Sequence, residues 1–119
     1  MVFSESLKKN RDFQNVYRKG KSFANKYLVM YILENNTNKN RLGLSASKKV
    51  GNSVVRHRII RLVRESYRLH ENIFNSGLDI VVVAKKSAAL VGYQEIEEAL
   101  LHLSKLHHMI KIYFYDEES

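Results

Sequence analysis

Five arginines and one histidine recur in the segment from Lys48 to Arg68, KKVGNSVVRHRIIRLVRESYR, at a spacing typical of one helix. At 3.6 residues per turn, four of them fall on one face and two flank the opposite, apolar face. The four are His57, Arg61, Arg64 and Arg68, and the two are Arg56 and Arg58. Only Glu65 lies among them, so the arginines would repel one another unless a polyanion covered them. Because guanidinium presents a planar fork of donors to phosphate, the segment indicates binding to nucleic acid.

The residues that lead into this helix favour the same chemistry. Lys48 and Lys49 precede a Gly-Asn turn, and Asn52 is placed to cap the helix. The first backbone N–H groups of a helix, together with its dipole, attract phosphate. Such turns are common, and a row of arginines can also be an ordinary solvated face, so both interpretations stay open on the pattern alone.

Aromatic side chains nearer the start of the chain would suit the stacking of unpaired bases. Phe13 and Tyr17 are one helical turn apart, and Tyr31 lies in an apolar run, on the same strand face as Tyr27. A groove lined by such rings, with cations at its rim, binds a single strand through stacking and phosphate contacts. The alternative is that the rings belong to an ordinary core.

The charge distribution favours a nucleic-acid partner and argues against a catalytic site in the chain itself. Residues 1–94 contain eighteen Lys or Arg and six Asp or Glu, whereas residues 95–119 contain two and six. Metal-dependent phosphodiester cleavage needs carboxylates that converge on ions, and the six acidic residues of the basic part are scattered. Glu98 and His102 have a spacing that could hold a metal, but a polar helix face explains them better. We therefore expect no metal or cofactor bound by the protein itself.

The elements that must position these groups follow from the apolar pattern of a 119-residue chain, the size of one domain. Residues 10–20 predict a short helix capped by Asn10. Residues 26–33 predict a strand covered on both faces. The polar loop at 35–40 predicts a hairpin that leads to an antiparallel partner strand at 41–47.

The arginine helix comes next in the chain. Its inner face would consist of Val55, Ile59, Leu62, Val63, Ser66 and Leu69. Residues 79–84 predict a buried strand, and residues 93–109 predict a final amphipathic helix, after which the tail at 111–119 either extends that helix or lies loose. The order α-β-β-α-β-α indicates a single α+β domain over 1–119, a sandwich of helices against one small sheet.

The chain contains no apolar run of the roughly 20 residues that a membrane span requires. Its first residues, MVFSESLKKN, lack the apolar core of a signal peptide. It has no cysteine, which excludes disulfides and thiolate zinc sites and suits a reducing compartment. We therefore expect a cytoplasmic protein with no membrane partner.

Several stretches together carry a resemblance to a known family. They are LKKNRDFQNVYRKGKSFANKYLVMY at 7–31, RLGLSASKKVGNSVVRHRIIRLVRES at 41–66 and DIVVVAKK at 79–86. Over about residues 6–109, the chain resembles the protein subunit of bacterial ribonuclease P. The most specific part is the arginine helix, which the family carries as an Arg-Asn-Arg signature after Lys-Lys-hydrophobic-Gly-Asn. Asp12-Phe13 and Ala24-Asn25 add independent support.

The resemblance implies an α+β fold of the ribosomal protein S5 domain 2-like type, with a left-handed β-α-β crossover through the arginine helix, although such crossovers are generally right-handed. It also implies that a catalytic RNA subunit uses Mg²⁺ to remove the 5′ leader from precursor tRNA, while the protein binds that RNA and the leader. The residues facing RNA would be Lys48, Lys49, Asn52, Arg56, His57, Arg58, Arg61, Arg64 and Arg68. The leader cleft between the first helix and the sheet would be lined by Phe13, Tyr17, Val29 and Tyr31.

The chain departs from the family pattern at three places. His57 stands where Asn is usual, Ile60 stands where Lys is usual and cannot bind phosphate, and the acidic residues Asp116 to Glu118 look atypical. Two other classes remain as alternatives: another basic RNA-binding module, such as a small ribosomal protein, and a protein-only nuclease that would depend on the chain's own carboxylates.

Overall fold

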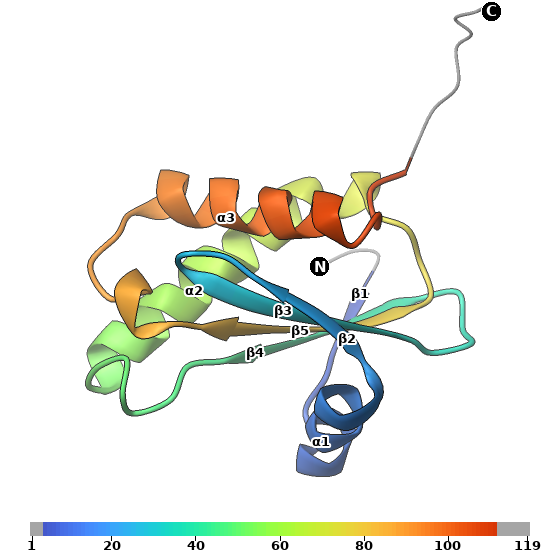
Figure 1. The fold of residues 1–119 in the computed structure, drawn as a ribbon, viewed down its shortest axis with the longest axis horizontal. Coiled ribbons are helices and arrows are strands. Elements are labelled where there is room, and N and C mark those ends of the chain that lie inside the picture. The colour runs from blue at the N-terminus through green and yellow to red at the C-terminus, as the bar shows by residue number, and fades with distance from the viewer. Residues whose placement is uncertain (1–3, 112–119) are drawn as a thin grey trace, which may run out of the picture.

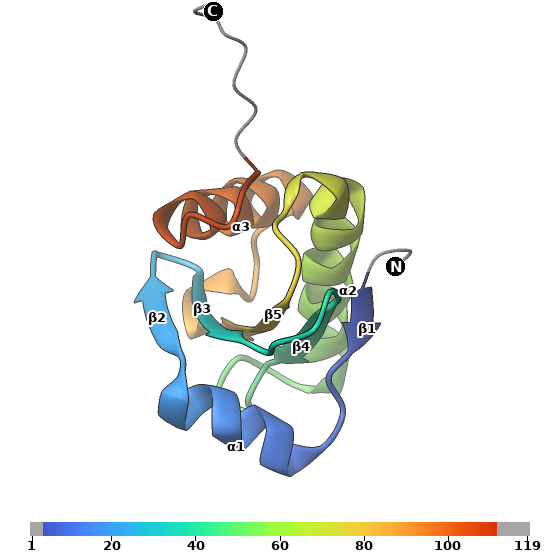
Figure 2. The ribbon, with the colours of Figure 1, turned by 90° about the vertical axis from the view of Figure 1, so that its right-hand side faces the viewer.

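The computed structural model describes residues 4–111 and arranges them as a five-stranded sheet with helices on both faces (Figure 1). The strands are β1 (Ser4–Ser6), β2 (Lys21–Ala24), β3 (Leu28–Glu34), β4 (Asn40–Ser45) and β5 (Leu78–Ala84). The helices are α1 (Asn10–Lys19), α2 (Ser53–His70) and α3 (Tyr93–Leu106), with 3-10 turns at Glu71–Ile73 and Lys86–Ala88. Helices α2 and α3 cover one face of the sheet, and α1 covers part of the other (Figure 1, Figure 2). This arrangement confirms the predicted α+β class.

The sheet is mixed, and its central connection has the rarer hand. In the order β1-β4-β5-β3-β2, β4 is parallel to both β1 and β5, whereas β3 is antiparallel to β5 and β2. Helix α2 joins the parallel neighbours β4 and β5. Seen from the helical face with both strands pointing up, β5 lies to the left of β4 (Figure 1, Figure 2). The crossover is therefore left-handed, as the family resemblance implies and against the general preference.

The predicted hairpin between residues 26–33 and 41–47 is wrong. Strands β3 and β4 are not neighbours, because β5 lies between them and pairs with both. The reason is that β5 is apolar on both faces and largely buried, so a central position satisfies both its packing and its hydrogen bonds. The loop between β3 and β4 instead passes the start of β5, where the side chain of Asn40 accepts the backbone N–H of Leu78 at 2.9 Å.

Several predicted boundaries shift, and two strands are additional. Helix α1 begins at Asn10, and its N-cap is Lys9, which provides no side-chain cap. Helix α3 ends at Leu106 rather than near residue 109, and His108 follows it with a φ of 56°, in the left-handed region. Strands β1 and β2 were not predicted from the sequence. Residues 112–119, which contain most of the predicted tail and the acidic residues Asp116 to Glu118, lie outside the described residues.

The main core lies between the sheet and the helices α2 and α3. The inner face of α2 is largely as predicted: Ile59, Val63 and Ser66 are buried, and Val55 and Leu62 are partly buried against the core. Leu69 is a wrong prediction, because 51% of its surface is exposed. Leu69 and Tyr67 lie on opposite edges of the apolar stripe, about 80° to either side of Ile59, and the edge with Tyr67 is the one that faces the core. No helix within residues 4–111 is long and apolar enough to cross a membrane.

Tyr67, which the sequence pattern did not place on the inner face, is buried near the end of α2, whereas Leu69 is exposed. It is 1% exposed, and its ring packs beside Phe74 with the ring centroids 5.3 Å apart. Its hydroxyl is hydrogen-bonded to the hydroxyl of Ser4 in β1 at 2.8 Å. Burial raises the pKa of this phenol, so it stays protonated and can take part in the bond. The short strand β1 is therefore tied to the C-terminal part of α2.

Candidate nucleic-acid interface

The start of α2 is built so that its lysines point outward. Val50 is buried, whereas Lys48 and Lys49 are exposed. Asn52 caps the helix as predicted, because its Oδ1 accepts the backbone N–H of Val55 at 3.0 Å. The first backbone N–H groups of the helix and the two exposed lysines give this end of α2 a positive character.

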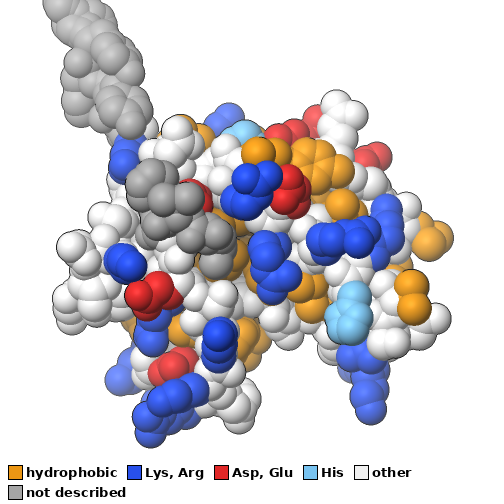
Figure 3. Space-filling model, turned by 180° about the vertical axis from the view of Figure 1, so that it is seen from behind, with side chains coloured by type: hydrophobic (Ala, Val, Ile, Leu, Met, Phe, Trp, Pro, Cys, Tyr) orange, Lys and Arg blue, Asp and Glu red, His pale blue; other side chains and the backbone are white. Residues whose placement is uncertain are grey.

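Three of the predicted RNA-binding residues on α2 are exposed and without a side-chain partner among residues 4–111. These are His57, Arg61 and Arg64, which form no hydrogen bond or ion pair there. Figure 3 shows the corresponding face, where Lys and Arg side chains are spread over the surface with few acidic side chains among them. A row of unpaired guanidinium groups in this setting attracts a polyanion.

Arg68 differs from the other exposed arginines because it is paired. Its Nε and Nη2 donate to the two carboxylate oxygens of Glu65 at 3.1 and 2.6 Å. The bond from Arg68 lowers the pKa of Glu65, so this carboxylate stays ionised and offsets the charge of Arg68. Both side chains are about half exposed, so the pair is open to exchange for a phosphate partner.

The two arginines that flank the apolar face are half buried. Arg58 donates from Nη2 to the carbonyl oxygen of Val91 at 2.7 Å, in the loop before α3. The Nε of Arg56 is buried and has no hydrogen-bond partner among the described residues. Part of each guanidinium is therefore buried in the protein, and only the remainder can face a ligand.

The predicted aromatic residues come together between α1 and the sheet. The rings of Phe13 and Tyr17 lie with centroids 6.3 Å apart, and Tyr17 meets Tyr31 of β3 edge to face at 5.0 Å. All three are partly buried over a small second core of Leu7, Val16 and Val81. They form one continuous aromatic wall, defined here as Phe13, Tyr17 and Tyr31, with part of each ring open to solvent.

Val29 and Tyr27 differ in their relation to this wall. Val29 lies two residues before Tyr31 on the same face of β3 and is partly buried. Tyr27 precedes β3 and packs against the main core on the other side, so the prediction that it shares a face with Tyr31 is wrong. Helix α1 covers only one end of its sheet face, and the start of α2 lies near the other end (Figure 1).

His102, which has a metal-ligand spacing from Glu98 in the sequence, has a hydrogen-bond partner within the protein. Within residues 4–111, no group of three or more His, Cys, Asp or Glu side chains could hold a metal ion. The Nδ1 of His102 lies 3.1 Å from the side-chain nitrogen of Asn25, which in turn donates to the carbonyl oxygen of Ala99. His102 therefore helps to fix the segment before β3 on α3.

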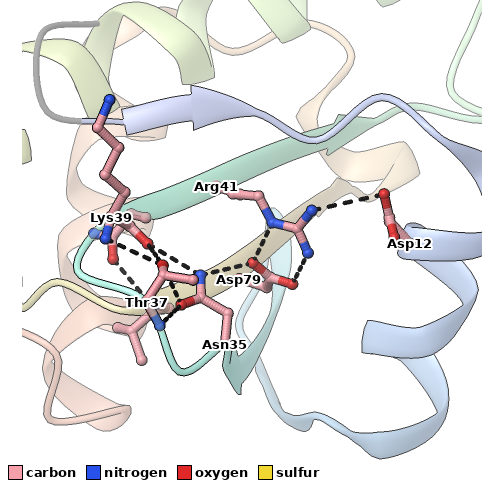
Figure 4. Close-up of polar contacts among 8 residues, drawn as sticks. Asp12, Asn35, Thr37, Lys39, Arg41 and Asp79 are labelled. Atoms are coloured by element: carbon pink, nitrogen blue, oxygen red, sulfur yellow. Dashed lines mark hydrogen bonds and ion pairs between the residues drawn. The ribbon is translucent and has the colours of Figure 1, made fainter.

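One group of charged residues was missed by the sequence reasoning. Asp79 is 2% exposed, and both of its carboxylate oxygens accept hydrogen bonds from Arg41 (Figure 4). The signal was an aspartate at the head of an otherwise apolar strand, which needs a cation when it is buried. Its partner, 38 residues away, is not recognisable from spacing.

Comparison with known proteins identifies the family. The family model for ribonuclease P matches residues 1–108. A relative from Lachnoclostridium phytofermentans, named ribonuclease P protein component, is 64% identical over 107 residues, which cover 90% of this chain and 92% of the relative.

Solved structures agree with this assignment. The ribonuclease P protein of Staphylococcus aureus superimposes with a TM-score of 0.84 at 37% identity, covering 91% of this chain and 99% of that one. The ribonuclease P protein of Thermotoga maritima gives a TM-score of 0.78 at 32% identity, covering 85% of this chain and 96% of that one. The chain described here therefore belongs to the ribonuclease P protein family.

Proposed function

We propose that this chain is the RNA-binding protein subunit of ribonuclease P, which together with a catalytic RNA subunit removes the 5′ leader from precursor tRNA. The observation that carries the proposal is the exposed face of His57, Arg61 and Arg64, which have no side-chain partner within residues 4–111, on a helix whose other face is buried. A rigid cationic face of this kind suits the phosphate backbone of a folded RNA. The proposal also assigns the protein to the cytoplasm, where precursor tRNA is made.

The division of labour follows from the residues present. The arginine face and the start of α2, with Lys48, Lys49 and Asn52, would bind phosphates of the RNA subunit. The aromatic wall and Val29 would receive the single-stranded leader, whose bases can stack on rings. Within residues 4–111 no group of carboxylates converges to hold a metal ion, so the Mg²⁺ that drives hydrolysis would be held by the RNA.

Reconstitution tests the proposal. The purified chain should not cleave precursor tRNA, and addition of the cognate RNA subunit at low Mg²⁺ should produce cleavage at the 5′ end of the mature tRNA. The RNA subunit alone at the same Mg²⁺ concentration is the control. The proposal would be wrong if the RNA-free chain cut the substrate or if the chain never increased cleavage by the RNA.

The protein-only nuclease can be tested in the same assay. Of the carboxylates it would need, Asp79 is engaged by Arg41 and Glu65 by Arg68, while Glu98 lies on α3. If RNA-free chain cleaved RNA, and if alanine at one of these positions abolished cleavage, the nuclease class would replace the proposal.

A general RNA-binding module, such as a small ribosomal protein, is separated from the proposal by the leader. The holoenzyme should bind precursor tRNA with a leader more tightly than the same tRNA without one. A ribosomal protein would bind the two tRNAs with equal affinity, because it would have no surface that binds the leader.

A further inference from the structure

Two residues of β4 face α1 and hold it from the same side of the sheet. Arg41 and Gly43 are two positions apart, and their partners in β5 are Asp79 and Val81. Since alternate residues of a strand share a face, the side chain of Arg41 and the Cα of Gly43 lie on the sheet face that α1 covers. We name this pair, Arg41 and Gly43, the α1 seat.

Arg41 is held in place before it reaches α1. Its Nε and Nη2 donate to Asp79 at 2.8 and 2.6 Å, and the side chain of Asn35 donates to the same carboxylate at 2.9 Å (Figure 4). The remaining nitrogen, Nη1, lies 3.7 Å from a carboxylate oxygen of Asp12 in the first turn of α1. The hydrogen bond and charge of Asp79 raise the pKa of Arg41, so a permanently charged and fixed guanidinium faces the helix.

Gly43 has no side chain, and the ring of Phe13 fills the space that a side chain would occupy. A Cβ at this position would lie 2.7 Å from Cζ and 2.8 Å from Cε1 of Phe13, and 3.1 Å from Cδ2 of Leu7. The ring of Phe13 therefore lies directly on the backbone of β4, and any side chain at Gly43 would displace it. Phe13 is the residue after Asp12, so the two parts of the seat hold adjacent residues of α1.

We infer that the α1 seat is a positioning device that sets how the aromatic wall faces the leader. Arg41 attracts Asp12 toward the sheet, and Gly43 sets how closely the ring of Phe13 can approach. The contact continues through the Phe13–Tyr17 and Tyr17–Tyr31 ring pairs, so a displaced Phe13 alters the whole wall. The inference rests on the proposed function, and the seat residues themselves need not touch RNA.

Gly43→Ala tests the seat directly. The holoenzyme is assembled with the cognate RNA, and Kd is measured for precursor tRNA with and without its leader. The readout is the leader advantage, which is the ratio of the Kd without the leader to the Kd with the leader. A general loss of RNA binding would change both Kd values and leave this ratio the same. We expect Gly43→Ala to reduce the leader advantage about tenfold, the effect of one misplaced stacked base. The affinity for leaderless tRNA should stay unchanged.

Gly92→Ala is the matched control. Gly92 precedes α3 on the other side of the sheet, and a Cβ there would have Glu95 Oε1 at 3.4 Å as its nearest neighbour, an ordinary contact. This variant should keep the wild-type ratio. Asp12→Asn tests the ionic half of the seat and should reduce the ratio by a smaller factor. Glu98→Gln removes an exposed carboxylate from α3, on the other side of the sheet, and should leave the ratio unchanged.

A double-mutant cycle tests whether Gly43→Ala acts on leader binding through the ring of Phe13 or through another part of the protein. In a Phe13→Ala background the ring that the new methyl group would strike is absent, so Gly43→Ala should have no further effect on the ratio. Additive losses in this cycle would overturn the inference. So would a wild-type ratio in both Gly43→Ala and Asp12→Asn, and the Asp12 variant also decides the matter if Gly43→Ala fails to fold.

The wild-type measurement separates a failure of the proposed leader-binding role from a failure of the α1 seat. If the wild-type holoenzyme itself showed no preference for the leader, the proposed leader-binding role would fail and the inference with it. If the wild-type holoenzyme preferred the leader and the seat variants did so equally, the seat alone would be refuted.

Discussion

Arg58 of α2 donates a hydrogen bond to the carbonyl oxygen of Val91 at 2.7 Å, which joins the arginine helix to the loop before α3. Arg58 is one of the family-signature residues, yet part of its hydrogen-bonding capacity is used within the protein. Arg61, less than one turn further along, is exposed and unpaired among residues 4–111. The two arginines therefore differ in what their removal should change.

Arg58→Ala should reduce both the free energy of unfolding and the affinity for the RNA subunit. The loss of a hydrogen bond from a charged group that reaches a backbone carbonyl should cost about 1–2 kcal/mol of stability. Arg61→Ala should weaken RNA binding and leave stability within about 0.5 kcal/mol of wild type. Urea unfolding and RNA titration of both variants measure this contrast, and equal stability of the two would show that the Val91 contact has no energetic weight.

Arg61 and Arg64 should each contribute to the salt dependence of RNA binding. If each neutralises one phosphate, alanine at either position should flatten the log–log plot of affinity against salt by about one unit of slope. An unchanged slope would indicate that these side chains face solvent in the complex.

Glu65 supplies a variant of opposite sign for the same measurement. Because Glu65 pairs with Arg68, Glu65→Gln should release that arginine and increase RNA affinity at low salt.

The parts of the fold that the sequence predicted are those with a strong local pattern. Helix α2 has a regular apolar stripe, and the predicted cap at Asn52 is confirmed. The predicted strand at 79–84 is confirmed as β5. Its continuous apolar run is buried on both faces, which requires a central position in the sheet. Strand β1 is three residues long and has no such pattern, so it could not be predicted.

What the sequence could not show is which strands lie side by side. The polar loop after β3 reads as a hairpin, yet the partner of β3 is supplied by β5, more than forty residues later in the chain. The Arg41–Asp79 pair forms only because β5 lies beside β4, so the α1 seat could not be predicted from the sequence either. By contrast, Phe13, Tyr17 and Tyr31 were singled out by residue type alone, and the structure brings them together.

Tyr31 should contribute to leader affinity through its ring. Tyr31→Leu keeps an apolar contact with Tyr17 but removes the aromatic face, and it should cost about 1–3 kcal/mol of leader affinity in the holoenzyme if a base stacks there. Tyr27→Leu is the matched control, since Tyr27 packs on the opposite side of the sheet. A similar loss for both variants would mean that the effect arises from the fold and not from the aromatic wall.

His107 should make the stability of the protein dependent on pH. Its Nε2 lies 2.8 Å from the carbonyl oxygen of Met30, and its ring meets Phe23 edge to face. Burial lowers the pKa of His107 below its ordinary value of 6.5, and the nearby charges of Lys21 and His108 act in the same direction. In the folded protein the neutral imidazole is favoured, and its Nε2–H donates to Met30.

The sign of the effect follows from proton linkage. As the pH falls below 6.5, the unfolded chain takes up a proton at His107 before the folded protein does, so the free energy of unfolding decreases. The decrease ends once the pH has passed the lowered pKa of the folded state, and above 6.5 this residue contributes no pH dependence. His107→Gln keeps a donor near Met30 but cannot titrate, so its stability should fall less steeply than that of wild type. Urea unfolding across this range checks the difference, and His57→Gln is the control because His57 is exposed and has no side-chain partner among residues 4–111. Parallel curves for wild type and His107→Gln would refute the prediction.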